Sequence, residues 1–148
     1  HIVGGAVTKP EQRYLKTLKK KYVSVNALWH GGVSHNVILD HIAACDVMIH
    51  PAICLDVFGL TIAEALAVGR PVIATRCGGA EIQIKDGENG LLVPPNDSLS
   101  LRQAIYSVIN KPSLIQEFAN QKSAIINIEQ HINDLKKVYE SSLYKTAS

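Results

Sequence analysis

The sequence has few cysteines, almost no surplus of charge and no long apolar run, and each shortage excludes a class of protein. The three cysteines are odd in number and contain no C-x-x-C pair, so we expect free thiols in a reducing cytoplasm. Fifteen Lys and Arg against thirteen Asp and Glu leave a net charge of +2. This balance gives no reason to expect a nucleic-acid partner.

Membrane-spanning and targeting signals are also missing. No apolar stretch approaches the roughly 18 residues that a bilayer-spanning helix needs. The start, His1 to Gly5, lacks the charged and then apolar plan of a signal peptide. It also lacks an initiator Met, so we expect a fragment of a longer protein.

What is present suits a single domain with one hydrophobic core. The chain has 148 residues, of which 47% are hydrophobic and 19% charged. At this length about two-thirds of the surface of the unfolded chain can be buried. Disordered and low-complexity classes are therefore excluded.

Short β-branched runs alternate with longer segments of helical period, which predicts an α/β fold. Several strands are unbroken apolar runs, as expected for a Rossmann-like, doubly wound parallel sheet with helices on both faces. A helical C-terminal segment follows, with interruptions expected at Pro112 and at Ser141-Ser142. The expected strands are 2–3, 23–27, 47–49, 71–75 and 91–93, and the expected helices before that segment are 10–21, 34–44, 58–68 and 79–84.

Asp56, Gly59 and Glu64 form the pattern that carries chemistry. Asp56 precedes a predicted helix, Gly59 lies in its first turn, and Glu64 lies inside it. The amides of residues 58–60 would be unpaired at the helix start, where the helix dipole favours a phosphate. Glu64 lies about 7.5 Å further along the axis, a distance that suits a ribose beside the helix. Asp56 could then accept hydrogen bonds from sugar hydroxyls.

Plainer interpretations stay open for these and other polar residues. Asp56 could simply cap the helix, and Glu64 could belong to its solvent-facing stripe. The run Lys19 to Lys21 suits the solvated end of a helix, with an anionic membrane surface as the alternative. We expect no metal site, because the spacing of the candidate ligands matches no zinc pattern: His30, His35, His41, His50, Cys54 and Cys77.

A linked series of motifs resembles the C-terminal half of retaining GT-B glycosyltransferases of family 4, also called group 1. The resemblance covers the chain up to about residue 110. The residues that carry it are D-x-F-G-L-x-x-x-E-A from Asp56 to Ala65, Gly69-x-Pro71-Val72, Gly78-Gly79, Asp86-Gly87, Gly90 to Pro94, and Asp97.

This resemblance implies a donor-binding domain that forms one half of a GT-B fold. The intact enzyme would transfer a hexose from a UDP- or GDP-sugar to a hydroxyl of a glycan or lipid acceptor, as in polysaccharide or lipopolysaccharide biosynthesis, without a metal or other cofactor. Asp56 and Glu64 would be the catalytic pair, with Asp56 on the sugar hydroxyls and Glu64 on the ribose. The backbone of Val57, Phe58, Gly59 and Leu60 would contact sugar and phosphate.

Two departures from the family pattern shape the expectation for the whole chain. Asp56 stands where the family usually has Glu. The Arg and Lys that neutralise the donor diphosphate in this family should precede Ile2, and no such pair is present.

We therefore expect residues 1–148 to be one nucleotide-sugar-binding domain that lacks its first strand and the acceptor domain, and that is inactive alone. A nucleotide-sugar epimerase or phosphorylase of GT-B fold, and a non-catalytic interaction module derived from that fold, stay open as alternatives.

Overall fold

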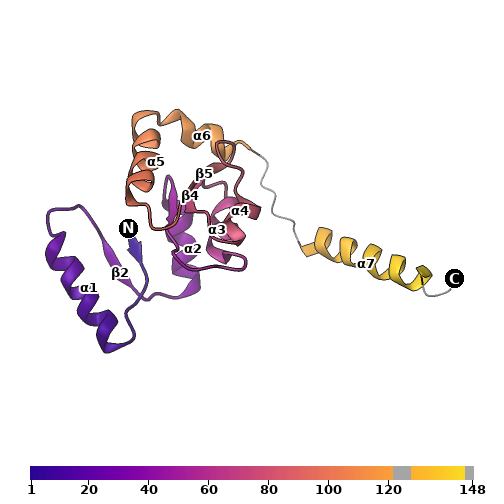
Figure 1. Ribbon diagram of the computed structural model, residues 1–148, viewed down its shortest axis with the longest axis horizontal. Coiled ribbons are helices and arrows are strands. Elements are labelled where there is room, and N and C mark those ends of the chain that lie inside the picture. The colour runs from indigo at the N-terminus through magenta and orange to yellow at the C-terminus, as the bar shows by residue number, and fades with distance from the viewer. Residues whose placement is uncertain (122–127, 146–148) are drawn as a thin grey trace.

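The computed structural model describes residues 1–121 and 128–145 of the chain (Figure 1). Strands and helices alternate up to β5, and helices follow. In order they are β1 (Ile2–Val3), α1 (Lys9–Lys21), β2 (Trp29–Gly31), α2 (His35–Ala44), β3 (Met48–His50), α3 (Leu60–Ala67), β4 (Val72–Thr75), α4 (Gly79–Gln83), β5 (Gly90–Val93), α5 (Ser98–Asn110), α6 (Ser113–Ala119) and α7 (Ile128–Lys145).

The strands form two sheets, and every strand pairing in the described part of the chain is parallel. β1 pairs with β2, and β4 lies between β3 and β5. β1 and β3 are not hydrogen-bonded to each other. A cavity of about 260 Å³ is lined by residues of both strands and of the helix α2, including Val3, Ile38, Ile42 and Met48.

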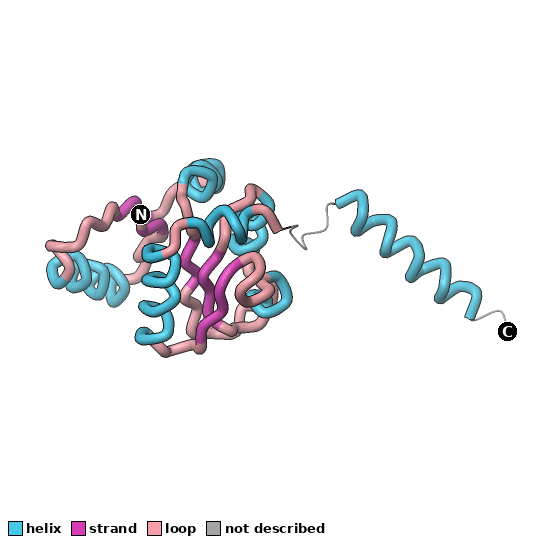
Figure 2. The backbone as a smooth tube through the Cα atoms, turned by 90° about the horizontal axis from the view of Figure 1, so that it is seen from above, coloured by secondary structure: helices cyan, strands magenta, loops and turns pink. Residues whose placement is uncertain are grey.

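Helices cover both faces of the three-stranded sheet (Figure 2). On one face Val72 and Ala74 of β4 pack with apolar residues of α2, α3 and α4. On the other face Ile73 packs with Val108 of α5. Because successive side chains of a strand point to opposite faces, this one strand contributes to both cores. The predicted α/β class, with a parallel sheet between helices, is confirmed.

The predicted strand at 23–27 is wrong, because the strand is β2, further along the chain. Val23 is 84% exposed and the amide of Val25 bonds back to the carbonyl of Tyr22, so this β-branched run forms a turn after α1. The predicted break at Pro112 is confirmed, since it separates α5 from α6. The break expected at Ser141-Ser142 is wrong, because α7 continues to Lys145.

The helical segment predicted at the C-terminal end is observed in α5, α6 and α7. It was also expected to include residues 122–127 and 146–148, which lie outside the described residues. Figures 1 and 2 show α7 apart from the two sheets and their helices. Within the described ranges, no helix combines the length and apolar character needed to cross a bilayer.

Candidate functional site

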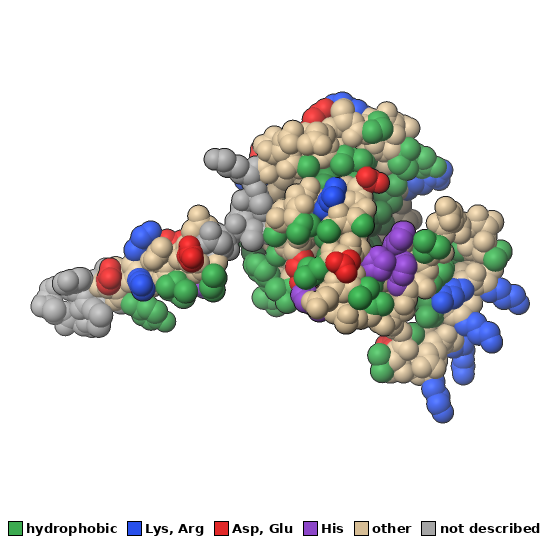
Figure 3. Space-filling model, turned by 180° about the vertical axis from the view of Figure 1, so that it is seen from behind, with side chains coloured by type: hydrophobic (Ala, Val, Ile, Leu, Met, Phe, Trp, Pro, Cys, Tyr) green, Lys and Arg blue, Asp and Glu red, His purple; other side chains and the backbone are tan. Residues whose placement is uncertain are grey.

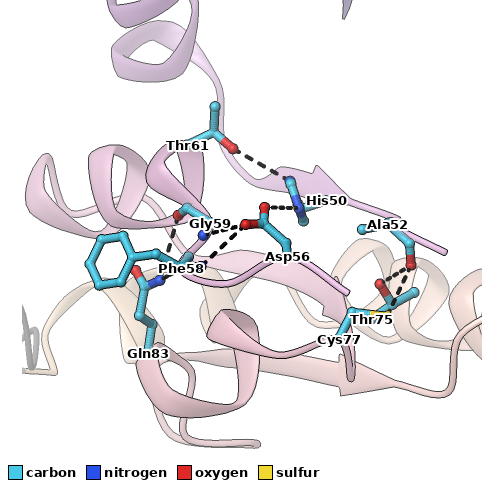
Figure 4. A network of polar contacts seen from close by, with 9 residues as sticks. All are labelled: His50, Ala52, Asp56, Phe58, Gly59, Thr61, Thr75, Cys77 and Gln83. Carbon is cyan, nitrogen blue, oxygen red and sulfur yellow. Dashed lines mark hydrogen bonds and ion pairs between the residues drawn. The ribbon is translucent and has the colours of Figure 1, made fainter. Parts of the chain in front are cut away.

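The candidate site lies at the carboxyl ends of β3 and β4. The loop of residues 51–59 leaves β3 and leads into α3, and the turn after β4 packs against it (Figure 4). In open parallel sheets, ligands bind at this edge, because loops from neighbouring strands meet there. The topology therefore places the motif from Asp56 to Glu64 at the edge where a ligand is expected.

Asp56 closes a turn immediately before α3. Its Oδ1 accepts hydrogen bonds from the backbone amides of Phe58, at 3.2 Å, and Gly59, at 2.9 Å. Gly59 has φ +73°, a left-handed conformation that glycine adopts without strain. A short carboxylate reaches amides two and three residues ahead, as in an Asx turn.

This turn corrects one sequence-based prediction. The amides of residues 58–60 were expected to be free for a phosphate, but those of Phe58 and Gly59 are occupied by Asp56. Among the described residues, the amides of Leu60 and Thr61 have no hydrogen-bond partner. Any anion at the start of α3 would therefore meet Leu60 and Thr61 rather than Phe58 and Gly59.

His50, at the end of β3, connects Asp56 to α3 (Figure 4). Its Nε2 lies 3.7 Å from Oδ2 of Asp56, and its Nδ1 lies 3.4 Å from Oγ1 of Thr61. Nε2 is buried and has no hydrogen-bond partner among the residues that the structure describes. In the sequence His50 was only a candidate metal ligand, and its contacts to Asp56 and Thr61 follow from the fold.

Glu64 lies one turn beyond Thr61 on α3. Its side chain is only 22% exposed, and its Oε1 lies 3.6 Å from Nε2 of His35 at the start of α2. It is therefore not part of a solvent-facing stripe. No contact joins Glu64 to Asp56, but positions three apart share a helix face. Thr61 and Glu64 therefore place the two acids and their histidines along one side of α3.

Gly78 and Gly79 hold the loop close to the turn after β4. The amide of Gly79 donates to the carbonyl of Asp56 at 2.8 Å. A Cβ on Gly79 would clash with the carbonyl oxygen of Phe58, and one on Gly78 with that of Asp56. The glycine pair of the sequence motif is therefore explained by close backbone contact.

Gln83 is a residue that sequence reasoning missed. It is 6% exposed, and its Nε2 donates to the carbonyl of Phe58 and, at 3.5 Å, to that of Gly59. Its Oε1 is buried and finds no partner in the described part of the chain. The buried Asn89 in turn donates to the Gln83 carbonyl at 3.1 Å. The one available signal was an amide between two isoleucines, Ile82 and Ile84.

A cavity of about 210 Å³ opens at the carboxyl ends of β3, β4 and β5. Thr75 lines it, and its Oγ1 donates to the carbonyl of Ala52 at 2.5 Å. Asp97 also lines this cavity. Its pKa is lowered by the hydroxyl of Ser100 and by the amides of Ser100 and Leu99. Around the loop, large apolar side chains are exposed, namely Ile53, Leu55, Val57, Phe58 and Leu60.

Arg70 and Arg76, the first two basic residues after α3, are bound to groups outside the loop. Arg70 donates to the carbonyl of Ala43 at 2.6 Å, and Arg76 forms an ion pair with Asp86 at 2.6 Å. The arrangement therefore offers carboxylates for sugar hydroxyls and two free amides for an anion. It shows no described arginine at the loop to neutralise a diphosphate.

Comparison with known proteins places this geometry in context. The family described as "Glycosyl transferases group 1" matches residues 1–124. A D-inositol 3-phosphate glycosyltransferase of Geodermatophilus obscurus is 29% identical over 112 residues, which are 76% of this chain and 25% of that protein. A probable sucrose-phosphate synthase 5 of Oryza sativa subsp. japonica is 40% identical over 84 residues, which are 57% of this chain and 8% of that protein. The chain thus spans a small part of these relatives.

Solved structures share the fold. The Anabaena protein HepE in complex with UDP-glucose superposes with a TM-score of 0.70 at 30% identity, over 79% of this chain and 32% of HepE. Sucrose-phosphate synthase from Thermosynechococcus elongatus gives a TM-score of 0.78 at 28% identity, over 99% of this chain and 38% of that one. The observed fold therefore matches one portion of larger glycosyltransferase structures.

Proposed function

The chain belongs to the glycosyl transferases of group 1, and from this we propose that it is the donor-binding domain of a hexosyltransferase. The donor is a UDP- or GDP-sugar, the acceptor is a hydroxyl of a glycan or lipid, and anomeric configuration is retained, as in family 4. The observation that carries the proposal is that Asp56 precedes α3 and Glu64 lies inside it, on either side of the free amides of Leu60 and Thr61. HepE, a structural neighbour, is known in complexes with UDP and UDP-glucose.

Each group has a role that follows from its contacts. The amides of Leu60 and Thr61 and the dipole of α3 stabilise the diphosphate, and Glu64 accepts hydrogen bonds from the ribose hydroxyls. Oδ1 of Asp56 holds the turn, which leaves Oδ2 for a hydroxyl of the sugar. The domain contributes positioning and charge stabilisation, not a covalent intermediate. The proposal requires no metal.

The proposed enzyme needs more than this domain. The acceptor site, the first strand and the Arg and Lys that neutralise the diphosphate would be supplied by a longer chain. The unpaired edges of β1 and β3 and the exposed apolar loop support this, because both are surfaces that further chain would cover. We accordingly expect no sugar transfer by residues 1–148 alone.

Nucleotide titration followed by amide chemical shifts tests the proposal. UDP and GDP at millimolar concentration should shift the amides of residues 57–64, those of Leu60 and Thr61 most. Glu64→Gln should weaken nucleotide binding by about 10- to 100-fold, since a carboxylate hydrogen bond contributes about 1.5–3 kcal/mol. The matched control Glu81→Gln, in an exposed position on α4, should behave like the unaltered chain. Unmoved amides at 57–64 would refute nucleotide binding here.

A non-catalytic interaction module remains a second candidate, because Asp56 also serves a purely local purpose. Its bonds to Phe58 and Gly59 would be useful in a loop that binds nothing. Activity of a longer protein that contains this domain separates the two candidates. Transfer that falls when Glu64 becomes Gln supports the enzyme, and absence of transfer in both forms supports the module.

We further propose that the domain works in the cytoplasm, at the inner face of a membrane. Figure 3 shows basic side chains gathered on one part of the molecule. The helix α1 carries Lys and Arg at six positions and one acid, Glu11. Three of these lysines follow one another at its last turn. Such a helix suits contact with anionic lipid headgroups near a lipid-linked acceptor, as in polysaccharide or lipopolysaccharide assembly.

A further inference from the structure

Three histidines that are distant in the sequence meet outside the candidate donor site. His1 precedes β1, His30 lies in β2 and His41 lies in α2. The ring centroids are 5.0 Å apart for His1 and His30, 4.2 Å for His30 and His41, and 5.5 Å for His1 and His41. One nitrogen of each ring lies within 4.8 Å of the others. Histidine side chains gather beside the lysine-rich helix in Figure 3.

The spacing of the nitrogens suits a tetrahedral metal ion. With Zn–N distances of about 2.0–2.1 Å, two ligand nitrogens on a tetrahedron lie about 3.3 Å apart. Nε2 of His30 and Nδ1 of His1 are 3.1 Å apart, close to that value. The third nitrogen, on His41, lies within 4.8 Å of the other two, so its side chain has to rotate toward them to bind the same ion. We propose that His1, His30 and His41 bind one divalent transition-metal ion of the zinc type.

The chemistry of the group selects this class of metal. The three ligands are imidazoles, and no carboxylate belongs to the described group. Calcium and magnesium require oxygen ligands, whereas imidazole suits zinc, cobalt, nickel and copper. Water would complete the coordination, as in other sites with three protein ligands.

Cys45 lines the same cavity as His1 and His41 but is not a ligand. Its Sγ donates to the carbonyl of Ile42 at 3.2 Å, and it does not belong to the group whose ligand atoms converge. Cys45→Ser should therefore leave metal affinity unchanged.

The site would connect the two sheets. His1 and His30 belong to the two-stranded sheet and its N-terminal extension, while α2 packs its Ile42 into the core of the three-stranded sheet. A metal that binds only the folded chain stabilises it. The site is separate from the proposed donor site, whose histidines are His35 and His50.

Titration of the metal-free chain with Co²⁺, followed by displacement with Zn²⁺, tests the inference. Co²⁺ should give the visible absorption of a low-coordinate imidazole complex, with one ion per chain. His30→Gln and His41→Gln should each weaken binding by about 100-fold, because each removes a direct ligand. The matched control His131→Gln, exposed on α7, should bind like the unaltered chain. Equal binding by all variants would overturn the proposal.

A second measurement needs no variant. X-ray absorption of the unaltered Zn²⁺ complex should count three imidazoles, and a count of one would overturn the proposal.

Discussion

Asp56 illustrates how one methylene group decides the role of a residue. The family pattern usually has Glu here, which is one methylene group longer than Asp. In the structure Asp56 bonds to amides only two and three residues ahead. A Glu carboxylate would stand one carbon further from the backbone and would close this turn less well. The acid thus holds the loop through one oxygen and is available to a ligand through the other.

Substitutions at Asp56 should show whether its hydrogen bonds or its charge stabilises the folded loop. Asp56→Asn keeps the Oδ1 acceptor, so we expect little change in the free energy of unfolding. Asp56→Ala removes both hydrogen bonds and should cost about 0.5–2 kcal/mol, as loss of a helix cap does. Denaturant unfolding of the three proteins measures this. Equal destabilisation by Asn and Ala would show that charge, rather than the turn, carries the effect.

At Gly79 the backbone of the neighbouring loop leaves no room for a side chain. Alanine there would place Cβ against the carbonyl of Phe58, and overpacking of this kind costs about 1–3 kcal/mol. Gly79→Ala should therefore unfold at lower denaturant and also weaken nucleotide binding, because the loop is displaced. Gly32→Ala is the matched control, since its nearest contact would be an ordinary 3.9 Å. If both variants match the unaltered chain in unfolding and titration, the close approach does not matter.

At the scale of an element, helix α5 begins with an aspartate that accepts hydrogen bonds from backbone amides, as Asp56 does before α3. Asp97 caps it by accepting from the amides of Leu99, at 3.1 Å, and Ser100, at 3.0 Å. The Ser100 hydroxyl also donates to it, which contributes most to the lowered pKa of Asp97. A group with a lowered folded-state pKa stabilises the fold above its ordinary pKa and loses this effect as pH falls through the lowered value.

The pH dependence of this cap can be checked with Asp97→Ala. We expect the variant to melt below the unaltered chain at pH 7. The gap in Tm should shrink as the pH falls below about 3.9, the ordinary pKa of Asp, because the native carboxylate becomes protonated. Thermal unfolding from pH 7 to pH 2.5 measures the gap. A gap that stays constant over this range would contradict the assigned cause.

Helices and strands were predictable from the sequence where residues close together in the chain determine where they begin. α1 begins where expected, because Thr8 and Glu11 form a capping box and Pro10 suits a first turn. The strand predicted at 23–27 failed, because β propensity reflects packing on a sheet and Val23 and Val25 find no sheet to pack on. α3 begins at Leu60 rather than residue 58, because Asp56 first closes its turn.

At the scale of the whole molecule, basic charge gathers on α1 although the chain as a whole is nearly neutral. We expect the chain to sediment with vesicles that contain phosphatidylserine at low salt. Each lysine near the surface contributes about 1 kcal/mol, and this attraction is screened as salt rises. Binding should be lost when Lys19, Lys20 and Lys21 are changed to Gln.

A control places the same number of changes elsewhere. Lys136→Gln and Lys137→Gln on α7, together with Lys85→Gln after α4, remove equal charge and should leave vesicle binding intact. Equal loss in both triple variants would show that net charge, not α1, drives the association. Sedimentation that persists at high salt would contradict an electrostatic origin.

By itself the sequence determined the α/β class, the parallel arrangement and the place of the Asp56 to Glu64 motif at a helix start. Those features follow from short-range periodicity, capping and glycine signals. Only the tertiary structure decided which amides stay free, that His50 and His35 accompany the two acids, that Gln83 supports the loop, and that three distant histidines meet. The reason is physical: these contacts join separate elements, and the packing of elements, not spacing along the chain, sets their distances.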